Sequence, residues 1–82
     1  AMDYMPQIKA HVVRAFSDKG LEIEQYDDVE QCIYFTIFKD GELRDMQARL
    51  VEDWWSEEPN VSISVDILVC GDWCHYHSVD IS

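Results

Sequence analysis

The clearest pattern in the chain is an alternation of apolar and polar residues between Asn60 and Val69. Branched apolar side chains occupy every second position there, namely Val61, Ile63, Val65, Ile67 and Val69. Successive side chains of a strand point to opposite faces, so this period of two predicts a strand with one face on a core. Gly71-Asp72 predicts a tight turn, after which the chain returns as a last strand from Trp73 to Ile81.

A helical period governs the N-terminal part, from Met5 to Lys19. Its apolar residues fall on one stripe at three- and four-residue spacing, namely Met5, Ile8, Val12, Ala15 and Phe16. Asp3 can cap this helix, Pro6 is compatible with its first turn, and Gly20 suits its end.

Two strands are expected next. Residues Leu21 to Tyr26 alternate between apolar and acidic positions, and Asp27-Asp28 supplies a turn. The second strand, Gln31 to Phe38, is apolar on both faces, with Tyr34 and Phe38 sharing one of them. This strand therefore either lies centrally in a sheet or offers an aromatic surface to a partner.

The stretch from Glu42 to Glu58 admits two interpretations. Asp40-Gly41 could close a hairpin, which would make the stretch a strand. We favour a helix, because apolar and acidic residues separate onto opposite arcs at a 3.6-residue period. The apolar arc holds Leu43, Leu50, Val51, Trp54 and Trp55, with Trp54 in the core and Trp55 at the border. The acidic arc holds Glu42, Asp45, Glu52, Asp53 and Glu57, and Pro59 ends the helix.

The predicted fold is α+β, in the order α-β-β-α-β-β. The simplest packing is a four-stranded antiparallel sheet with two helices on one face. Residues 1–82 are expected to form a single compact domain, with Ala1 a cloning remnant ahead of Met2. The absence of a long apolar run or a leader segment, and an odd cysteine count of three, indicate a cytoplasmic protein.

Charge narrows the class of partner. Seventeen Asp and Glu residues face six Lys and Arg residues, a net charge of −11, and no Lys or Arg occurs from Leu50 to Ser82. Nucleic acid and anionic membranes are bound through Lys and Arg, so neither is an expected direct partner. The alternative is that the charge serves only solubility.

The charge instead favours a basic protein partner. The carboxylates of the expected second helix would lie about 5–6 Å apart on one face, where they could occupy a groove that normally holds nucleic acid. The hypothesis is a DNA-mimicking inhibitor of a nucleic-acid-binding protein or nuclease complex, without catalysis or a cofactor. Small acidic inhibitors from phages and mobile elements, including some anti-CRISPR proteins, are similar in size and charge, although no shared motif carries this analogy. The residues expected to bind the partner are Glu42, Asp45, Glu52, Asp53, Glu57, Asp27 and Asp28, with Trp55 as an apolar anchor.

Two other classes stay open. An immunity protein or secretion-type chaperone would bind one cognate partner through an apolar patch, for which Tyr34 and Phe38 are the candidates, and a homodimer is compatible with this class. The other class is a zinc-binding domain that uses the last hairpin. Its candidate ligands are His75, His77, Asp66, Cys70 and Cys74. A turn at Gly71-Asp72 would point the two cysteines to opposite sides and place both histidines on one face, so no complete site is predicted.

Overall fold

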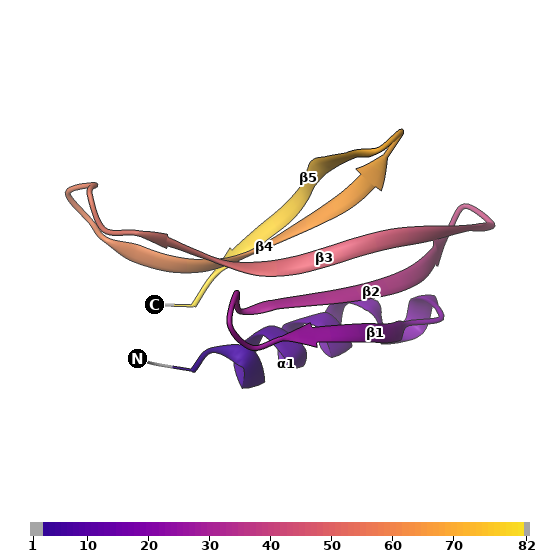
Figure 1. Cartoon of the computed structure of the whole chain (residues 1–82), viewed down its shortest axis with the longest axis horizontal. Helices are drawn as coiled ribbons and strands as arrows, with labels where there is room; N and C mark the ends of the chain where they lie inside the picture. The colour runs from indigo at the N-terminus through magenta and orange to yellow at the C-terminus, as the bar shows by residue number, and fades with distance from the viewer. Residues whose placement is uncertain (1–2, 82) are drawn as a thin grey trace.

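The computed structural model describes residues 3–81, which form one helix and one five-stranded sheet (Figure 1). Ala1, expected to be a cloning remnant, lies outside the described residues. The elements are α1 (Met5–Phe16), the short 3-10 helix η1 (Ser17–Lys19), β1 (Glu22–Asp27), β2 (Cys32–Lys39), β3 (Glu42–Asp53), β4 (Asn60–Val69) and β5 (Asp72–Asp80). Within residues 3–81, no helix is long and apolar enough to cross a membrane.

The first helix forms as its pattern predicts. The Asp3 carboxylate accepts a hydrogen bond from the Met5 backbone N–H at 3.0 Å, and Pro6 lies in the first turn. The stripe residues Met5, Ile8, Val12 and Phe16 are all buried. Gly20 follows η1 with φ +64°, a left-handed conformation that costs glycine little.

The sheet is an antiparallel meander in which every strand pairs with its neighbour in sequence, in the order β1-β2-β3-β4-β5. The antiparallel α+β class is confirmed, with five strands and one helix in place of the expected four and two. The hairpin β2–β3 turns at Asp40-Gly41 with φ +54° and +78°. The hairpin β4–β5 turns at Cys70-Gly71 with φ +50° and +84°, one residue earlier than predicted. Positive φ at both turn residues matches the twist of the strands that they join.

The predicted helix from Glu42 to Glu58 is wrong. Residues Glu42–Asp53 form the longest strand, β3, which pairs with β2 on one side and with β4 on the other. Its buried residues, Met46 and Ala48, follow a period of two. Most residues of this stretch are good helix formers, but two ladders of backbone hydrogen bonds and the burial of one face outweigh that preference.

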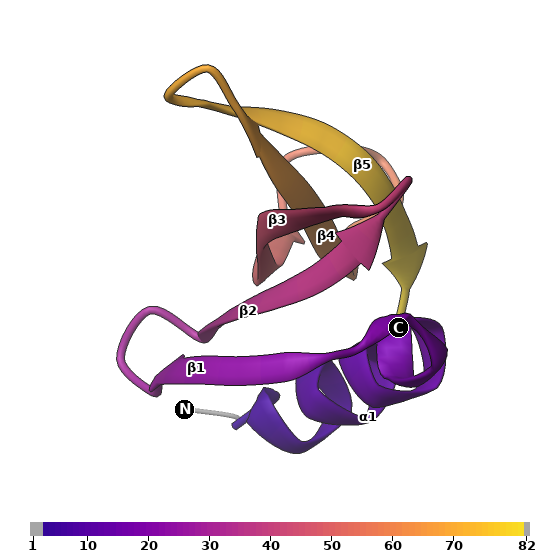
Figure 2. The ribbon, with the colours of Figure 1, turned by 90° about the vertical axis from the view of Figure 1, so that its right-hand side faces the viewer.

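The core lies between α1 and one face of the sheet. The helix stripe packs on Ile33, Phe35 and Ile37 of β2 and on alternate residues of β3 and β4. The sheet twists strongly, so that β4 and β5 swing away from β1 and β2 while the end of β5 returns toward α1 (Figure 2). We call the sheet face opposite α1 the outer face; no helix among residues 3–81 covers it.

Candidate functional site

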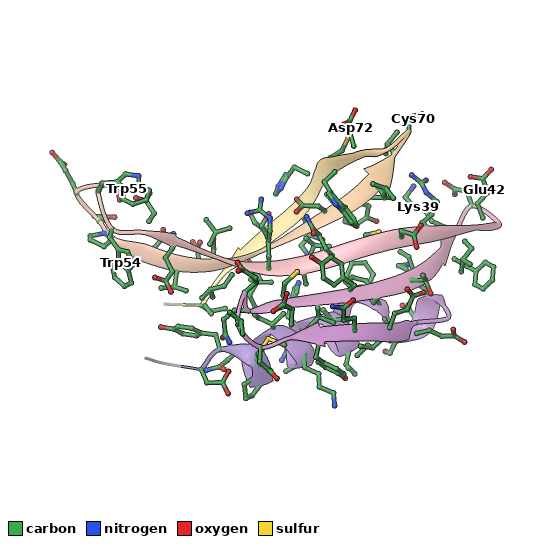
Figure 3. All side chains as sticks on the ribbon, in the orientation of Figure 1. Lys39, Glu42, Trp54, Trp55, Cys70 and Asp72 are labelled. Carbon is green, nitrogen blue, oxygen red and sulfur yellow. The ribbon has the colours of Figure 1, made fainter. Side chains whose placement is uncertain are left out.

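Strand β3 separates the acids that were expected to share one helical face. Alternation along the strand places Asp45 on the outer face and puts Glu52 and Asp53 on opposite faces. Glu42 lies beside the β2–β3 turn, at the opposite end of the molecule from Trp55 (Figure 3). Because these acids lie on different faces and toward different ends of the molecule, they do not form the predicted continuous acidic face.

The structure gathers part of that set at the end of the β3–β4 hairpin. We define the hairpin tip as residues 52–59; its acids are Glu52, Asp53, Glu57 and Glu58. Trp55 is 86% exposed there and Trp54 is 57% exposed, so the expected burial of Trp54 in the core is wrong. The tip projects from one end of the molecule with both indole rings at the surface (Figure 3).

Hydrogen bonds fix the conformation of the hairpin tip. The Trp54 Nε1–H donates to Glu52 Oε2 at 2.7 Å, and the Ser56 N–H donates to Asp53 Oδ1 at 3.3 Å. The Ser56 hydroxyl donates to the Glu58 carbonyl oxygen at 3.0 Å. The polar end of the Trp54 indole is therefore satisfied within the chain, while its apolar ring stays available to a partner.

The acids of the β1–β2 turn have unequal roles. Asp27 Oδ1 accepts the Glu30 backbone N–H at 3.0 Å, so its carboxylate shapes the turn. The Asp28 carbonyl oxygen accepts from the Gln31 side chain at 2.7 Å, and the Asp28 side chain remains exposed. Of the two predicted contact residues, Asp28 is the freer to meet a partner.

A buried carboxylate lies at the centre of the outer face. The Asp66 side chain is 5% exposed, and its Oδ2 accepts hydrogen bonds from Gln47 Nε2 at 2.8 Å and Arg49 Nε at 2.9 Å. His75 Nδ1 lies 3.9 Å from Asp66 Oδ1. A histidine of the last hairpin opposite Asp66 was expected, but Gln47 and Arg49 were missed, because assigning β3 as a helix removed both from the strand beside Asp66.

The same cluster contains a serine, but not in a catalytic arrangement. Ser64 Oγ lies 3.3 Å from His75 Nδ1, the ring nitrogen that also faces Asp66. A nucleophile–histidine–acid relay needs the nucleophile and the acid on different ring nitrogens. The cluster is therefore arranged as a hydrogen-bonded support for the outer face.

Aromatic and aliphatic side chains flank this cluster on the outer face. The rings of Tyr34 and Trp73 lie 6.4 Å apart between centroids, inclined by 46°. A hydrogen bond with Cys32 raises the pKa of Tyr34, which keeps the phenol neutral. Phe38 and Leu43 pair across β2 and β3 and are 55% and 61% exposed. The side of β2 that carries Tyr34 and Phe38 thus contributes to an accessible aromatic surface, one of the two arrangements expected for this strand.

The last hairpin separates the candidate zinc ligands. A bulge between the Val65 and Asp66 pairings places His75 beside Asp66 on the outer face and His77 beside Val65 on the core face. The expectation that the two histidines share a face is therefore wrong. Cys70 lies in the turn, and Cys74 pairs with Ile67 on the core-facing side. Within residues 3–81, no three His, Cys, Asp or Glu side chains gather as a ligand set.

His77 instead joins β5 to α1. Its Nε2 lies 2.8 Å from His11 Nε2, and its ring stacks on Phe16 with centroids 5.8 Å apart. Burial, followed by repulsion from His77, lowers the pKa of His11. Burial, followed by repulsion from His75, lowers the pKa of His77. Both rings therefore favour the neutral form, in which one N–H donates to the other nitrogen.

No protein family model, curated protein or solved structure matches this chain. Function is therefore inferred from the chemistry of the surfaces described above.

Proposed function

We propose that this protein is a small acidic interaction module that binds a basic surface of a nucleic-acid-binding protein and blocks access of the nucleic acid. The observation that carries this proposal is the hairpin tip, where two exposed tryptophans stand among four acids. No Lys or Arg occurs from Leu50 to Ser82, so the tip itself, β4 and β5 hold no such base, and Arg49 of β3 pairs with Asp66 and not with a tip acid.

Tryptophan and carboxylate contribute different parts of such binding. An exposed tryptophan is a frequent anchor of interfaces, since its large ring becomes buried in a partner pocket. Carboxylates attract Lys and Arg over distances of about a Debye length and speed association, in a salt-dependent way. A partner that presents bases around an apolar pocket would satisfy both requirements.

The proposed blocking mechanism is competition for the same cations. Lys and Arg that neutralise phosphates supply most of the non-specific affinity of a protein for nucleic acid. Once these cations pair with Glu52, Glu57 and Glu58, they no longer bind phosphate. A protein of net charge −11 also repels the nucleic acid from the occupied site.

The first test is affinity capture with the tagged protein, at low and high salt, with and without duplex DNA. Recovery of nucleic-acid-binding proteins that both salt and DNA release supports the proposal. Recovery of no specific partner in any condition means that the charge serves solubility alone.

A pair of variants then locates the surface. Glu52→Gln, Glu57→Gln and Glu58→Gln together remove three tip charges and preserve an acceptor for the Trp54 indole. The matched control, Asp40→Asn with Glu42→Gln and Asp72→Asn, removes three charges in or beside the β2–β3 and β4–β5 turns; Figure 3 shows Glu42 and Asp72 away from Trp54 and Trp55 of the tip. We expect the tip variant to lose about tenfold or more in affinity and the control to lose less than about threefold. Equal losses would assign binding to overall charge and not to the tip.

One observation favours a second candidate. The exposed pair Phe38 and Leu43 gives the outer face an apolar patch of the kind that an immunity protein or chaperone uses for one cognate partner. Such a complex would stay bound at high salt, and added duplex DNA would not displace the partner. Phe38→Ser with Leu43→Ser would then abolish capture, whereas the tip variant would not.

A further inference from the structure

A cavity of about 260 Å³ opens on the outer face, and all five strands contribute to its lining. Its lining includes Glu24 and Gln25 of β1, Tyr34 of β2, Asp45 of β3, Leu68 of β4 and Trp73 of β5. The twist of the sheet draws these side chains together, although 49 positions separate Glu24 from Trp73 in the sequence.

The charged groups of this cavity are all negative. Glu24 and Asp45 are both exposed, and neither takes part in an ion pair among residues 3–81. No Lys, Arg or His of the described chain lines the cavity. The nearest base in sequence, Arg44, donates instead to the Leu68 carbonyl oxygen at 3.4 Å. A cation that enters the cavity would therefore meet two carboxylates that lack a partner cation.

The aromatic rings add a second attraction for a cation. Tyr34 and Trp73 lie 6.4 Å apart between centroids and are inclined by 46°, and Trp73 is 42% exposed. A cation within about 6 Å of a ring centroid is attracted by the negative face of the ring, most strongly for tryptophan. Leu68, beside Trp73 in the pairing of β4 and β5, adds an aliphatic wall.

We propose that this cavity receives an arginine side chain of a partner protein. The planar guanidinium can lie against an aromatic ring while its fork of N–H groups pairs with a carboxylate, and the aliphatic stem can cover Leu68. Lysine fits less well, because its compact and strongly hydrated ammonium offers no plane to stack. The cavity is separate from the hairpin tip, so this inference does not depend on the function proposed for the tip.

The test uses short peptides and NMR of the ¹⁵N-labelled protein, with the Trp73 indole N–H as the reporter. The peptides are acetyl-Gly-Arg-Gly-amide, the same peptide with lysine, and the same peptide with citrulline, which is nearly isosteric with arginine but neutral. We expect a saturable shift with arginine, an affinity about fivefold lower with lysine, and no saturable shift with citrulline. The indole N–H signals of Trp54 and Trp55 in the hairpin tip serve as internal controls, and their chemical shifts should not change.

Two single substitutions separate the cavity from general attraction to an acidic protein. Asp45→Asn removes one negative charge from the cavity and should lower the affinity for the arginine peptide about fivefold. Asp28→Asn removes one exposed charge in the β1–β2 turn and should change its affinity by less than about twofold. The spectrum of each variant reports whether the fold is intact.

Three results would overturn the inference: citrulline binding as well as arginine, all three indoles shifting alike, or Asp45→Asn binding as tightly as the unmodified protein. Because the tip variant keeps the whole cavity, it should bind the arginine peptide unchanged. Failure here therefore leaves the function proposed for the tip standing, and failure at the tip leaves this inference standing.

Discussion

Replacing Arg49 should destabilise the protein more than neutralising its partner Asp66. The two members of the pair differ in solvation, since the Arg49 side chain is 47% exposed and the Asp66 side chain only 5%. Arg49→Met therefore leaves a buried carboxylate with Gln47 as its remaining close donor, at 2.8 Å. Asp66→Asn leaves a guanidinium that water can solvate and an amide oxygen that still accepts from Gln47 or Arg49.

The expected magnitudes follow from that asymmetry. Removing one partner from a fully buried pair costs about 3–5 kcal/mol, and we reduce this to about 2–3 kcal/mol for Arg49→Met because the cation is half in solvent. Asp66→Asn loses charge assistance in two hydrogen bonds and should cost about 1 kcal/mol. The double variant no longer buries a charge, so we expect it to be more stable than Arg49→Met by about 1 kcal/mol.

Urea unfolding followed by tryptophan fluorescence, near neutral pH, gives the four free energies of unfolding that this cycle requires. Arg14→Met, a substitution at an exposed position of α1, serves as the control for loss of one positive charge. The reasoning is refuted if the double variant is less stable than Arg49→Met. It is refuted equally if Arg49→Met lies within about 0.5 kcal/mol of the unmodified protein.

Three further predictions follow from single features. His11 and His77 both have a pKa below 6.5, the ordinary value for histidine, in the folded protein. The unfolded chain therefore binds protons at a higher pH than the folded protein does. The stability contributed by the two neutral rings is complete above pH 6.5 and is lost as the pH falls from 6.5 through the pKa values of the folded state. Urea unfolding at several pH values should show stability falling from pH 6.5 toward pH 5, and His77→Gln should reduce this fall whereas His75→Gln retains it. Cys70 and Cys74 are exposed whereas Cys32 is buried with a raised pKa, so a thiol reagent should modify two cysteines quickly and the third only on unfolding; fast reaction of all three would contradict this burial. Gly71→Ala should lower the free energy of unfolding in urea by about 1–2 kcal/mol, because its φ of +84° is strained for any residue with a Cβ. The new Cβ would meet no atom within 4 Å, so the cost is backbone strain and not a clash. An unchanged unfolding midpoint would contradict this strain.

The parts of the fold that could be predicted are those where one periodicity excludes the other. The stripe of α1 fits only a helix, and the alternation from Val61 to Val69 fits only a strand. Strand β3 carries both signals, since Leu43, Leu50 and Trp54 lie on a helical arc while Met46 and Ala48 alternate as in a strand. The Asp40-Gly41 pair was the local signal that pointed to the strand, because an Asp-Gly pair strongly favours a two-residue hairpin, but the helical arc was given more weight.

The error at β3 also limited what could be said of the candidate site. Net charge followed from the sequence, since it does not depend on register. The border position of Trp55 was argued from a helix that does not form, and its 86% exposure comes from its place in the hairpin tip. The hairpin tip, the Asp66 network and the outer-face cavity depend on which strands are neighbours, and β3 contacts both β2 and β4. Without β3 as a strand, Asp45 could not be placed beside Trp73 or Arg49 beside Asp66.

The meander order of the sheet has a consequence for folding kinetics. Each strand pairs only with the strand before or after it, so successive hairpins can form with short loop closures, which favours rapid folding. The hydrogen bond between His11 and His77 spans 66 positions and joins the first helix to the last strand. If that contact forms after the rate-limiting step, its removal should accelerate unfolding while leaving the refolding rate nearly unchanged. The contact between α1 and β5 would then control the unfolding rate, and so the lifetime of the folded state, with little influence on the folding rate.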